Sequence, residues 1–251
     1  MFIKVKYINN IVKLYHNFDE IIPNYITDID CSGNGLISLP DNMNFPILKV
    51  FNCSGNKLTS LPDNMNFPKL EVFDCSINEL TSLPDNMDFP RLKYFSCFNN
   101  KLSSLTGTMN LTNLEVFNCY INKLTSLPDN MNFPNITEFN CRSNNLTSLP
   151  DNMNLPNIKL FNCNDNKLSR LPLWLNNCHN IEVFYCNDNK LTSLPDNMNI
   201  PNIEVFSCNN NKLTSLPLWL MNCPKLRHII YENNEILLSP EMIKFINSLC
   251  R

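Results

Sequence analysis

The chain has 251 residues, with 20 basic and 23 acidic side chains and a formal net charge of −3. The charges are spread evenly and form no lysine or arginine run, which speaks against nucleic acid or an anionic membrane surface as the partner. No apolar stretch approaches the roughly 20 residues that a membrane span needs. Residues 1 to 6 alternate apolar residues with lysines and do not resemble a signal peptide, so we expect a cytoplasmic location.

Residues 1–25 are expected to form an N-terminal β-hairpin cap. Residues 2 to 8 and 11 to 16 are rich in apolar side chains. Asn9 and Asn10 between them suit the turn, because asparagine tolerates the positive φ that such turns need. Residues 18 to 22 then suit a helical turn that ends before Pro23.

Residues 26–238 consist of ten copies of one repeat. Its consensus sequence is Leu-x-x-Phe-x-Cys-x-x-Asn-x-Leu-x-x-Leu-Pro, as in residues 48 to 62. Successive copies are 22 or 23 residues apart, and Tyr231 takes the place of cysteine in the last copy. A fixed period of this size is typical of a solenoid. The cysteines that mark the period are Cys31, Cys53, Cys75, Cys97, Cys119, Cys141, Cys163, Cys186 and Cys208.

The spacing within one copy predicts a short strand. Phe51 and Cys53 are two residues apart and therefore point to the same face of a strand. Stacked copies would make these strands parallel neighbours, with both side chains in the core. The rest of each copy is short and bounded by prolines, which favours extended or single-turn 3₁₀ structure. Met65 and Phe67 would close the core from that side.

One asparagine follows each cysteine position by three residues. Its side chain can satisfy backbone groups where the chain turns away from the strand, and stacked copies would form a ladder of hydrogen bonds. The predicted structural ladder consists of Asn34, Asn56, Asn78, Asn100, Asn122, Asn144, Asn166, Asn189, Asn211 and Asn234.

This pattern resembles the leucine-rich repeat, with phenylalanine and cysteine replacing two of its leucines. The copies are similar to the short repeats of bacterial effectors and large DNA viruses. The resemblance implies a leucine-rich repeat horseshoe, an α/β solenoid with a parallel β-sheet on its concave face and mostly extended or 3₁₀ structure on its convex side. It says little about function, because this fold serves receptors, inhibitors, scaffolds and ligase adaptors.

Three places depart from the regular repeat. Residues 105 to 109 replace Leu-Pro-Asp-Asn-Met with Leu-Thr-Gly-Thr-Met, which predicts a different convex turn. Two copies contain Leu-Pro-Leu-Trp-Leu, with Trp174 and Trp219, and we expect a helical turn at each. Residues 239–251 are expected to form a C-terminal capping helix, because Ser239 suits an N-cap and Pro240 the first helical position.

The cysteines invite metal, disulfide and catalytic interpretations, and we favour a core ladder of free thiols over all three. One cysteine per 22 residues does not converge on a metal ion. Parallel Cβ vectors do not suit a disulfide. A nucleophilic thiol needs exposure, whereas these thiols occupy the core position of the repeat. We therefore expect no metal and no cofactor.

A binding site has to use positions that point away from the core. Most concave positions are small and polar, but large side chains gather in the fourth to sixth copies. Aromatic residues and arginine are enriched at binding hot spots. The predicted partner-binding residues are Tyr94, Phe98, Tyr120, Arg142, Ile77, Ile121 and Glu138.

We interpret the chain as a non-catalytic module that binds a protein partner of unknown identity on its concave surface, as a viral or host-directed adaptor. Three alternatives stay open. The first is a substrate-recognition subunit of a ubiquitin-ligase or signalling complex, the second is an extracellular recognition protein, and the third is an enzyme. The enzyme alternative is disfavoured because the three histidines lie far apart in the sequence and no Ser/His/Asp grouping or Gly-rich phosphate loop is present.

Overall fold

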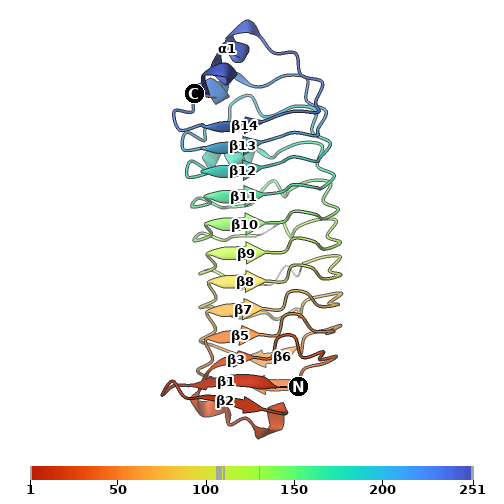
Figure 1. Cartoon of the computed structure of the whole chain (residues 1–251), viewed down its shortest axis with the longest axis vertical. Coiled ribbons are helices and arrows are strands. Elements are labelled where there is room, and N and C mark those ends of the chain that lie inside the picture. The colour runs from red at the N-terminus through yellow and green to blue at the C-terminus, as the bar shows by residue number, and fades with distance from the viewer. Residues whose placement is uncertain (1, 106–108, 110, 130, 250–251) are drawn as a thin grey trace. The chain divides into compact units, whose positions relative to one another are not determined.

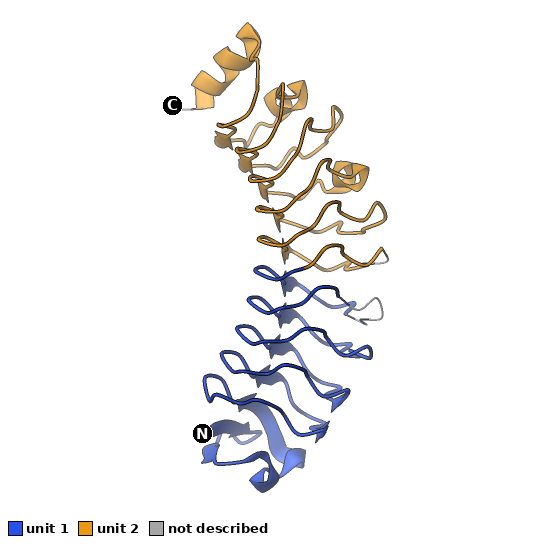
Figure 2. Ribbon diagram, turned by 90° about the vertical axis from the view of Figure 1, so that its right-hand side faces the viewer, with its two compact units in different colours: residues 1–123 blue, residues 124–251 orange. Residues whose placement is uncertain are grey.

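The computed structural model describes residues 2–105, 109, 111–129 and 131–249. It divides into two units, Met1–Lys123 and Leu124–Arg251, shown in blue and orange in Figure 2. Each unit is built from stacked turns of about one repeat each, and the two are described in turn.

The first unit begins with an antiparallel hairpin and continues as a parallel sheet (Figure 1). Strand β1 pairs antiparallel with both β2 and β3, and every later strand pairs in register with the strand of the preceding copy. The order is β9-β8-β7-β5-β3-β1-β2. The strands are β1 (Ile3–Tyr7), β2 (Val12–Tyr15), β3 (Ile26–Asp30), β5 (Val50–Asn52), β7 (Val72–Asp74), β8 (Tyr94–Ser96) and β9 (Val116–Asn118).

The opposite side of the first unit is mostly extended. Two short strands there, β4 (Asn42–Asn44) and β6 (Asn64–Asn66), pair in parallel. The 3₁₀ turns η1 (Phe18–Glu20) and η2 (Pro23–Tyr25) connect the hairpin to β3. The hairpin turn places Asn10 at a φ of 64°, so one of the two turn asparagines adopts the positive φ that the sequence predicts.

The second unit repeats the same plan. Its strands pair in parallel in the order β14-β13-β12-β11-β10. They are β10 (Glu138–Asn140), β11 (Leu160–Asn162), β12 (Val183–Tyr185), β13 (Val205–Ser207) and β14 (His228–Ile230). Both tryptophan copies form five-residue 3₁₀ helices, η3 (Leu173–Asn177) and η4 (Leu218–Asn222). Each indole N–H donates to a proline carbonyl of the preceding copy, which anchors the helix.

The chain ends with helix α1 (Pro240–Leu249), which contacts η4. The hydroxyl of Ser239 accepts a hydrogen bond from the Met242 amide at 3.2 Å, so Ser239 acts as the N-cap. Met242 is the buried residue of this helix. At ten residues α1 is much shorter than a bilayer span, and none of the helices in the described ranges has the length and apolarity to cross a membrane.

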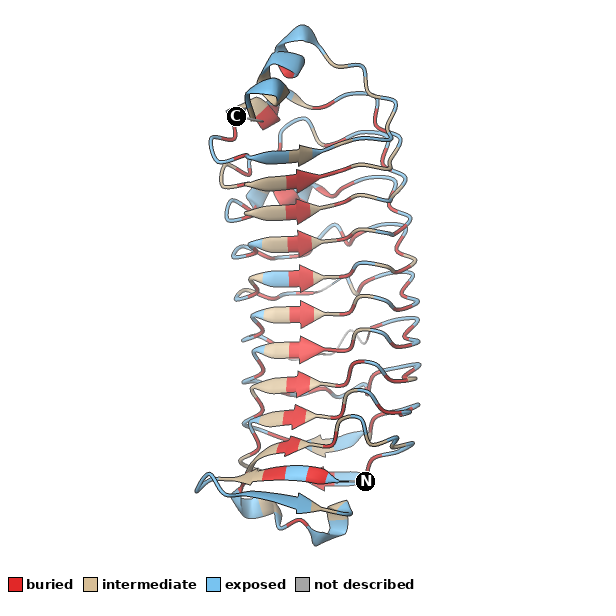
Figure 3. Cartoon of the chain, in the orientation of Figure 1, coloured by how far each residue is buried: buried red, intermediate tan, exposed pale blue. Residues whose placement is uncertain are grey.

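The core of each unit is a column of phenylalanine rings beside a column of thiols. The phenylalanine of each repeat strand from β5 to β13 is buried, and most of the residues beside it are more open (Figure 3). In the first unit, Phe73 stacks on Phe51 and on Phe95 with ring centroids 5.5 Å apart in both pairs. In the second unit, Phe161 stacks on Phe139 and Phe184 at 5.8 and 5.6 Å. This packing follows directly from the two-residue spacing of Phe and Cys.

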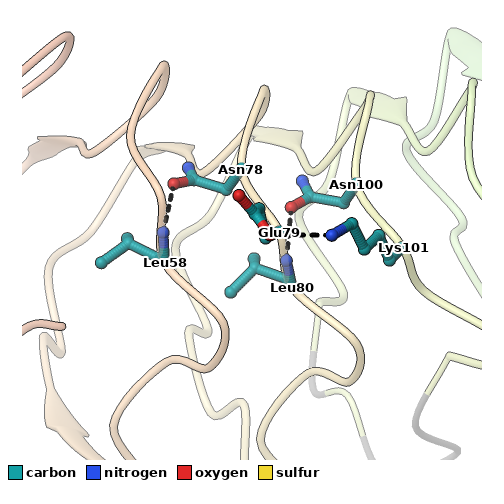
Figure 4. Close-up of polar contacts among 6 residues, drawn as sticks. All are labelled: Leu58, Asn78, Glu79, Leu80, Asn100 and Lys101. Atoms are coloured by element: carbon teal, nitrogen blue, oxygen red, sulfur yellow. Dashed lines mark hydrogen bonds and ion pairs between the residues drawn. The ribbon is translucent and has the colours of Figure 1, made fainter. Parts of the chain in front are cut away.

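The asparagines form a ladder between successive turns (Figure 4). Asn78 Oδ1 accepts a hydrogen bond from the Leu58 amide of the preceding copy at 3.0 Å. Its Nδ2 donates to the carbonyls of Cys53 and Cys75 at 3.0 and 3.1 Å. Asn100 repeats the first contact with Leu80 at 3.0 Å. The side chains of Asn78 and Asn100 therefore tie two turns together while they satisfy buried backbone groups. Asn34, at the start of the ladder, bonds the backbone of Phe2 instead.

The predicted fold class is confirmed: a repeat solenoid with a parallel sheet and a largely extended and 3₁₀ opposite side. One detail differs, since Phe67 is buried but Met65 is only half-buried in β6. The different turn predicted for residues 105 to 109 falls largely outside the described residues. The tyrosine position also differs from the thiol positions, because Tyr231 is partly exposed.

Candidate interaction surface

The outer face of the sheet, opposite the phenylalanine and thiol columns, displays the residues on either side of each strand centre. Because side chains alternate along a strand, Tyr94 and Ser96 lie on this face while Phe95 lies in the core. The register of the sheet then aligns equivalent residues of successive copies in rows. Tyr94 lies between Val72 and Val116 in one such row, and Val50 continues it.

A stacked aromatic pair lies on the outer face of the first unit. The rings of Phe98 and Tyr120 are nearly parallel, with centroids 4.4 Å apart and an interplanar angle of 5°. Both side chains are half-buried. They come from the position directly after cysteine in two successive copies. The stack presents a rigid flat surface, the kind of surface that binding hot spots use.

Two exposed isoleucines lie next to this pair in a strained conformation. Ile77 and Ile121 have φ values of 54° and 53°, in the left-handed region, and each is 47% exposed. This region costs an L-residue roughly 1–2 kcal/mol, and a β-branched side chain suits it least. Other copies fill the same position with residues that tolerate it better, namely Gly33, Gly55, Asn99, Ser143, Asp165, Asp188, Asn210 and Asn233.

The backbone connects these residues into one surface. The Ile77 amide donates to the Phe98 carbonyl, and the Asn99 amide donates to the Tyr120 carbonyl, both at 2.9 Å. We call the set formed by Ile77, Tyr94, Phe98, Tyr120 and Ile121 the aromatic patch. The structure thus places five of the seven predicted partner-binding residues in the first unit.

The other two predicted residues belong to the second unit. Glu138 is the first residue of β10 and is exposed. Arg142 is exposed as well, and its backbone amide donates to Asn140 Oδ1 at 3.1 Å. Their participation in the same binding surface stays a prediction.

One feature of the outer face differs from the sequence-based interpretation. Three serines expected to point into solvent, Ser76, Ser96 and Ser207, are buried. Ser96 lies between Tyr94 and Phe98, and its hydroxyl has no hydrogen-bond partner among the residues that the structure describes. The valine row beside Tyr94 belongs to the outer face as the sequence predicts, since these valines occupy the same repeat position as Tyr94.

Relief of strain predicts an unusual mutational result at the two isoleucines. Ile77→Asn and Ile121→Asn each remove a half-buried apolar side chain, which normally costs about 1 kcal/mol. Here the loss of left-handed strain offsets that cost, so we expect stability to change by less than about 0.5 kcal/mol or to rise. Urea unfolding checks this. Ile229→Asn in β14 is the control, because Ile229 is half-exposed in ordinary strand geometry and should lose the full amount.

The described cysteines are buried free thiols. Burial raises the pKa of Cys31 and Cys141 to about 12, and it raises the pKa of Cys53, Cys75 and Cys97 well above the usual value. A thiol in this state is a weak nucleophile. Among the same residues no group of three or more His, Cys, Asp or Glu side chains could hold a metal ion.

The raised thiol pKa values predict a loss of stability in alkaline solution. Above pH 9 the unfolded chain releases thiol protons that the folded chain retains up to about pH 12 at Cys141. Stability should therefore be full below pH 9 and fall as the pH rises towards 12. Cys141→Ala should reduce the slope of unfolding free energy against pH by up to about 1.4 kcal/mol per pH unit. Equal slopes for both proteins would contradict this assignment.

The first unit also contains an open groove of about 490 Å³ on another side of the turns. Three successive Ser-Leu-Pro-Asp segments line it and contribute the carboxylates of Asp41, Asp63 and Asp85. The lining provides hydroxyl and carboxylate groups but neither a histidine nor a thiol.

Comparison with known proteins gives structural matches only. No protein-family model matches the sequence, and neither does any curated protein sequence. The leucine-rich repeat protein LIC12759 of Leptospira interrogans has a similar structure, with a TM-score of 0.63, 20% identity, and coverage of 92% of this chain and 79% of that chain.

Two further similar structures come from other bacteria. YopM, described as a leucine-rich effector protein of Yersinia pestis, matches with a TM-score of 0.55 and 28% identity over 84% of this chain and 51% of its own. The functional domain of InlJ from Listeria monocytogenes, which includes a cysteine ladder, matches with a TM-score of 0.67 and 24% identity over 89% of this chain and 50% of its own. This chain thus spans about half the length of these two. The chain therefore has the fold of the leucine-rich repeat proteins.

Proposed function

We propose that the chain is a non-catalytic protein-binding module, and that its partner docks on the aromatic patch through apolar side chains of its own. Solenoids of stacked repeats offer extended surfaces that suit this use. The observation that carries the proposal is the presence of two isoleucines that are both strained and half-exposed, at Ile77 and Ile121. Neither burial nor backbone geometry favours isoleucine at this position, and strained residues cluster at binding sites.

The surroundings of the isoleucines support the same proposal. The stacked rings of Phe98 and Tyr120 need no ordering when a partner arrives, so the entropy cost of binding is small. The row of Val50, Val72 and Val116 extends the apolar surface along the sheet from Tyr94. An apolar centre with polar surroundings is the usual anatomy of a protein interface.

The test compares affinity capture from cell extract by three proteins. The Phe98→Ser/Tyr120→Ser variant should lose the partner that the wild-type chain retains. The matched control is Leu173→Ser/Leu218→Ser, which removes two exposed apolar side chains from η3 and η4 and should retain the partner. Circular dichroism checks that all three are folded. Equal retention by the wild-type chain and the aromatic variant would refute the proposal.

A second candidate is the substrate-recognition subunit of a ubiquitin-ligase or signalling complex, which would use the same patch with an additional subunit. Copurification of ligase components with the wild-type chain would distinguish it. The cytoplasmic location, the viral or host-directed role, and the capping roles of residues 1–25 and 239–251 stay predictions.

A further inference from the structure

The N-terminal hairpin and the 3₁₀ turns after it expose an unusual number of apolar side chains. Seven large apolar residues between residues 2 and 25 are at least 50% exposed. Folding leaves them in water although most other large apolar residues of the first unit are buried, and a concentration of this kind marks an interaction surface. The residues are Phe2, Ile8, Ile11, Val12, Leu14, Ile22 and Tyr25.

Strand β2 is also an open edge of the sheet. It pairs with β1 on one side, and no strand of the described residues pairs with its other side. The Tyr7 amide donates to the Ile11 carbonyl at 2.9 Å, which fixes Tyr7 and Ile11 as a hydrogen-bonded pair. Hydrogen-bonded and non-bonded pairs alternate along an antiparallel ladder. The backbones of Lys13 and Tyr15 therefore bond to β1, and those of Val12 and Leu14 point outward.

The open edge is not protected by charge in the usual way. An edge strand often carries a lysine that prevents pairing with another strand. In β2, however, the Lys13 ammonium lies 5.6 Å from the centroid of the Tyr7 ring, on its own hairpin. Val12 and Leu14 are on the opposite face, beside Lys6 and Lys4 of β1, and are 50% and 62% exposed. Backbone groups and apolar side chains thus coincide at the same two residues.

We propose that β2 pairs antiparallel with β2 of a second copy of this chain, with Leu14 opposite Leu14 on a two-fold axis. In this register the outward backbone groups of both strands meet, and Val12 lies opposite His16. Lys13 lies opposite Tyr15, so a cation faces an aromatic ring. The neighbouring register would place Lys13 opposite Lys13, and like charges directly opposite destabilise a strand pair.

A second copy fits this edge better than an unrelated strand because the sequence of β2 is complementary to itself in this register. A two-fold arrangement satisfies the open edges of both copies at once and closes the assembly as a dimer. It also brings the exposed Val12 and Leu14 of both copies onto one continuous apolar face.

The first test uses proline at an outward-facing position. Leu14→Pro removes an amide that points away from β1, so the hairpin keeps its internal bonds while the edge is blocked. Light scattering over a dilution series should give a dimer mass for the wild-type chain and at least about tenfold weaker self-association for the variant. A monomer mass for the wild-type chain throughout, or unchanged association of the variant, would overturn the proposal.

The second test measures the register and does not depend on proline. A Leu14→Cys chain should form an interchain disulfide under mild oxidation, because Leu14 lies opposite its own copy at about 5.5 Å between Cα atoms. Lys13→Cys is the matched control, since each new thiol would face Tyr15 of the other copy and would have no thiol opposite it. Oxidation of the wild-type chain gives the background yield of interchain disulfide from the native thiols. Equal yields from the two cysteine variants would contradict the proposed pairing.

Discussion

Replacing Phe95 with alanine is expected to lower the free energy of unfolding by about 3–5 kcal/mol. Phe95 is fully buried in β8 and stacks between Phe73 and Phe117, with centroid distances of 5.5 and 5.3 Å. Its removal leaves a cavity that the rigid column of rings cannot fill. In a stacked array each turn is stabilised by its neighbours, so the loss affects the interfaces on both sides.

Equilibrium unfolding in urea measures this loss. The control is Phe98→Ala, three residues later on the outer face, where the ring is half-buried and the expected loss is about 1 kcal/mol. Comparable losses at Phe95 and Phe98 would show that the ring column does not hold the turns together.

Replacing Asn78 with alanine is expected to cost about 2–4 kcal/mol although the side chain is small and polar. The buried amide of Leu58 loses its acceptor, and the carbonyls of Cys53 and Cys75 lose a donor. Buried backbone groups without partners carry the full desolvation cost. The change leaves little room for water to replace the amide, because Asn78 is only 8% exposed.

Asn86→Ala is the matched control for the ladder, because Asn86 is exposed on the opposite side of the turn. We expect a change of less than about 0.5 kcal/mol there. Thermal and urea unfolding of both variants make the comparison. Similar small losses at Asn78 and Asn86 would mean that the ladder contributes little to stability.

The sequence predicts the fold well because the copies of the repeat share the same spacing of core and turn residues. The Phe-x-Cys spacing identifies the core face in every copy, and the asparagine three residues later identifies the turn. The two copies that contain Leu-Pro-Leu-Trp-Leu differ in sequence from the others, and they form the 3₁₀ helices η3 and η4 at that segment. Each of these features depends on local spacing alone.

The surface is harder to read because its properties depend on neighbours in space. The left-handed position is occupied by Gly, Ile, Asn, Ser or Asp in different copies, so no residue type reveals its φ. Ser96 and Ser207 are buried although the same strand position holds partly exposed residues in other copies. The stacking of Phe98 on Tyr120 requires the register between copies. The sequence could indicate that large residues gather there, but not that two of them are strained.

We propose that the strain and exposure of Ile77 and Ile121 serve binding. The most direct test measures partner binding and urea unfolding on the same Ile77→Asn/Ile121→Asn protein, with the partner captured by the wild-type chain. We predict unchanged or higher stability together with at least about tenfold weaker binding. Unchanged stability with unchanged binding would contradict the claim, because the isoleucines would then contribute to neither.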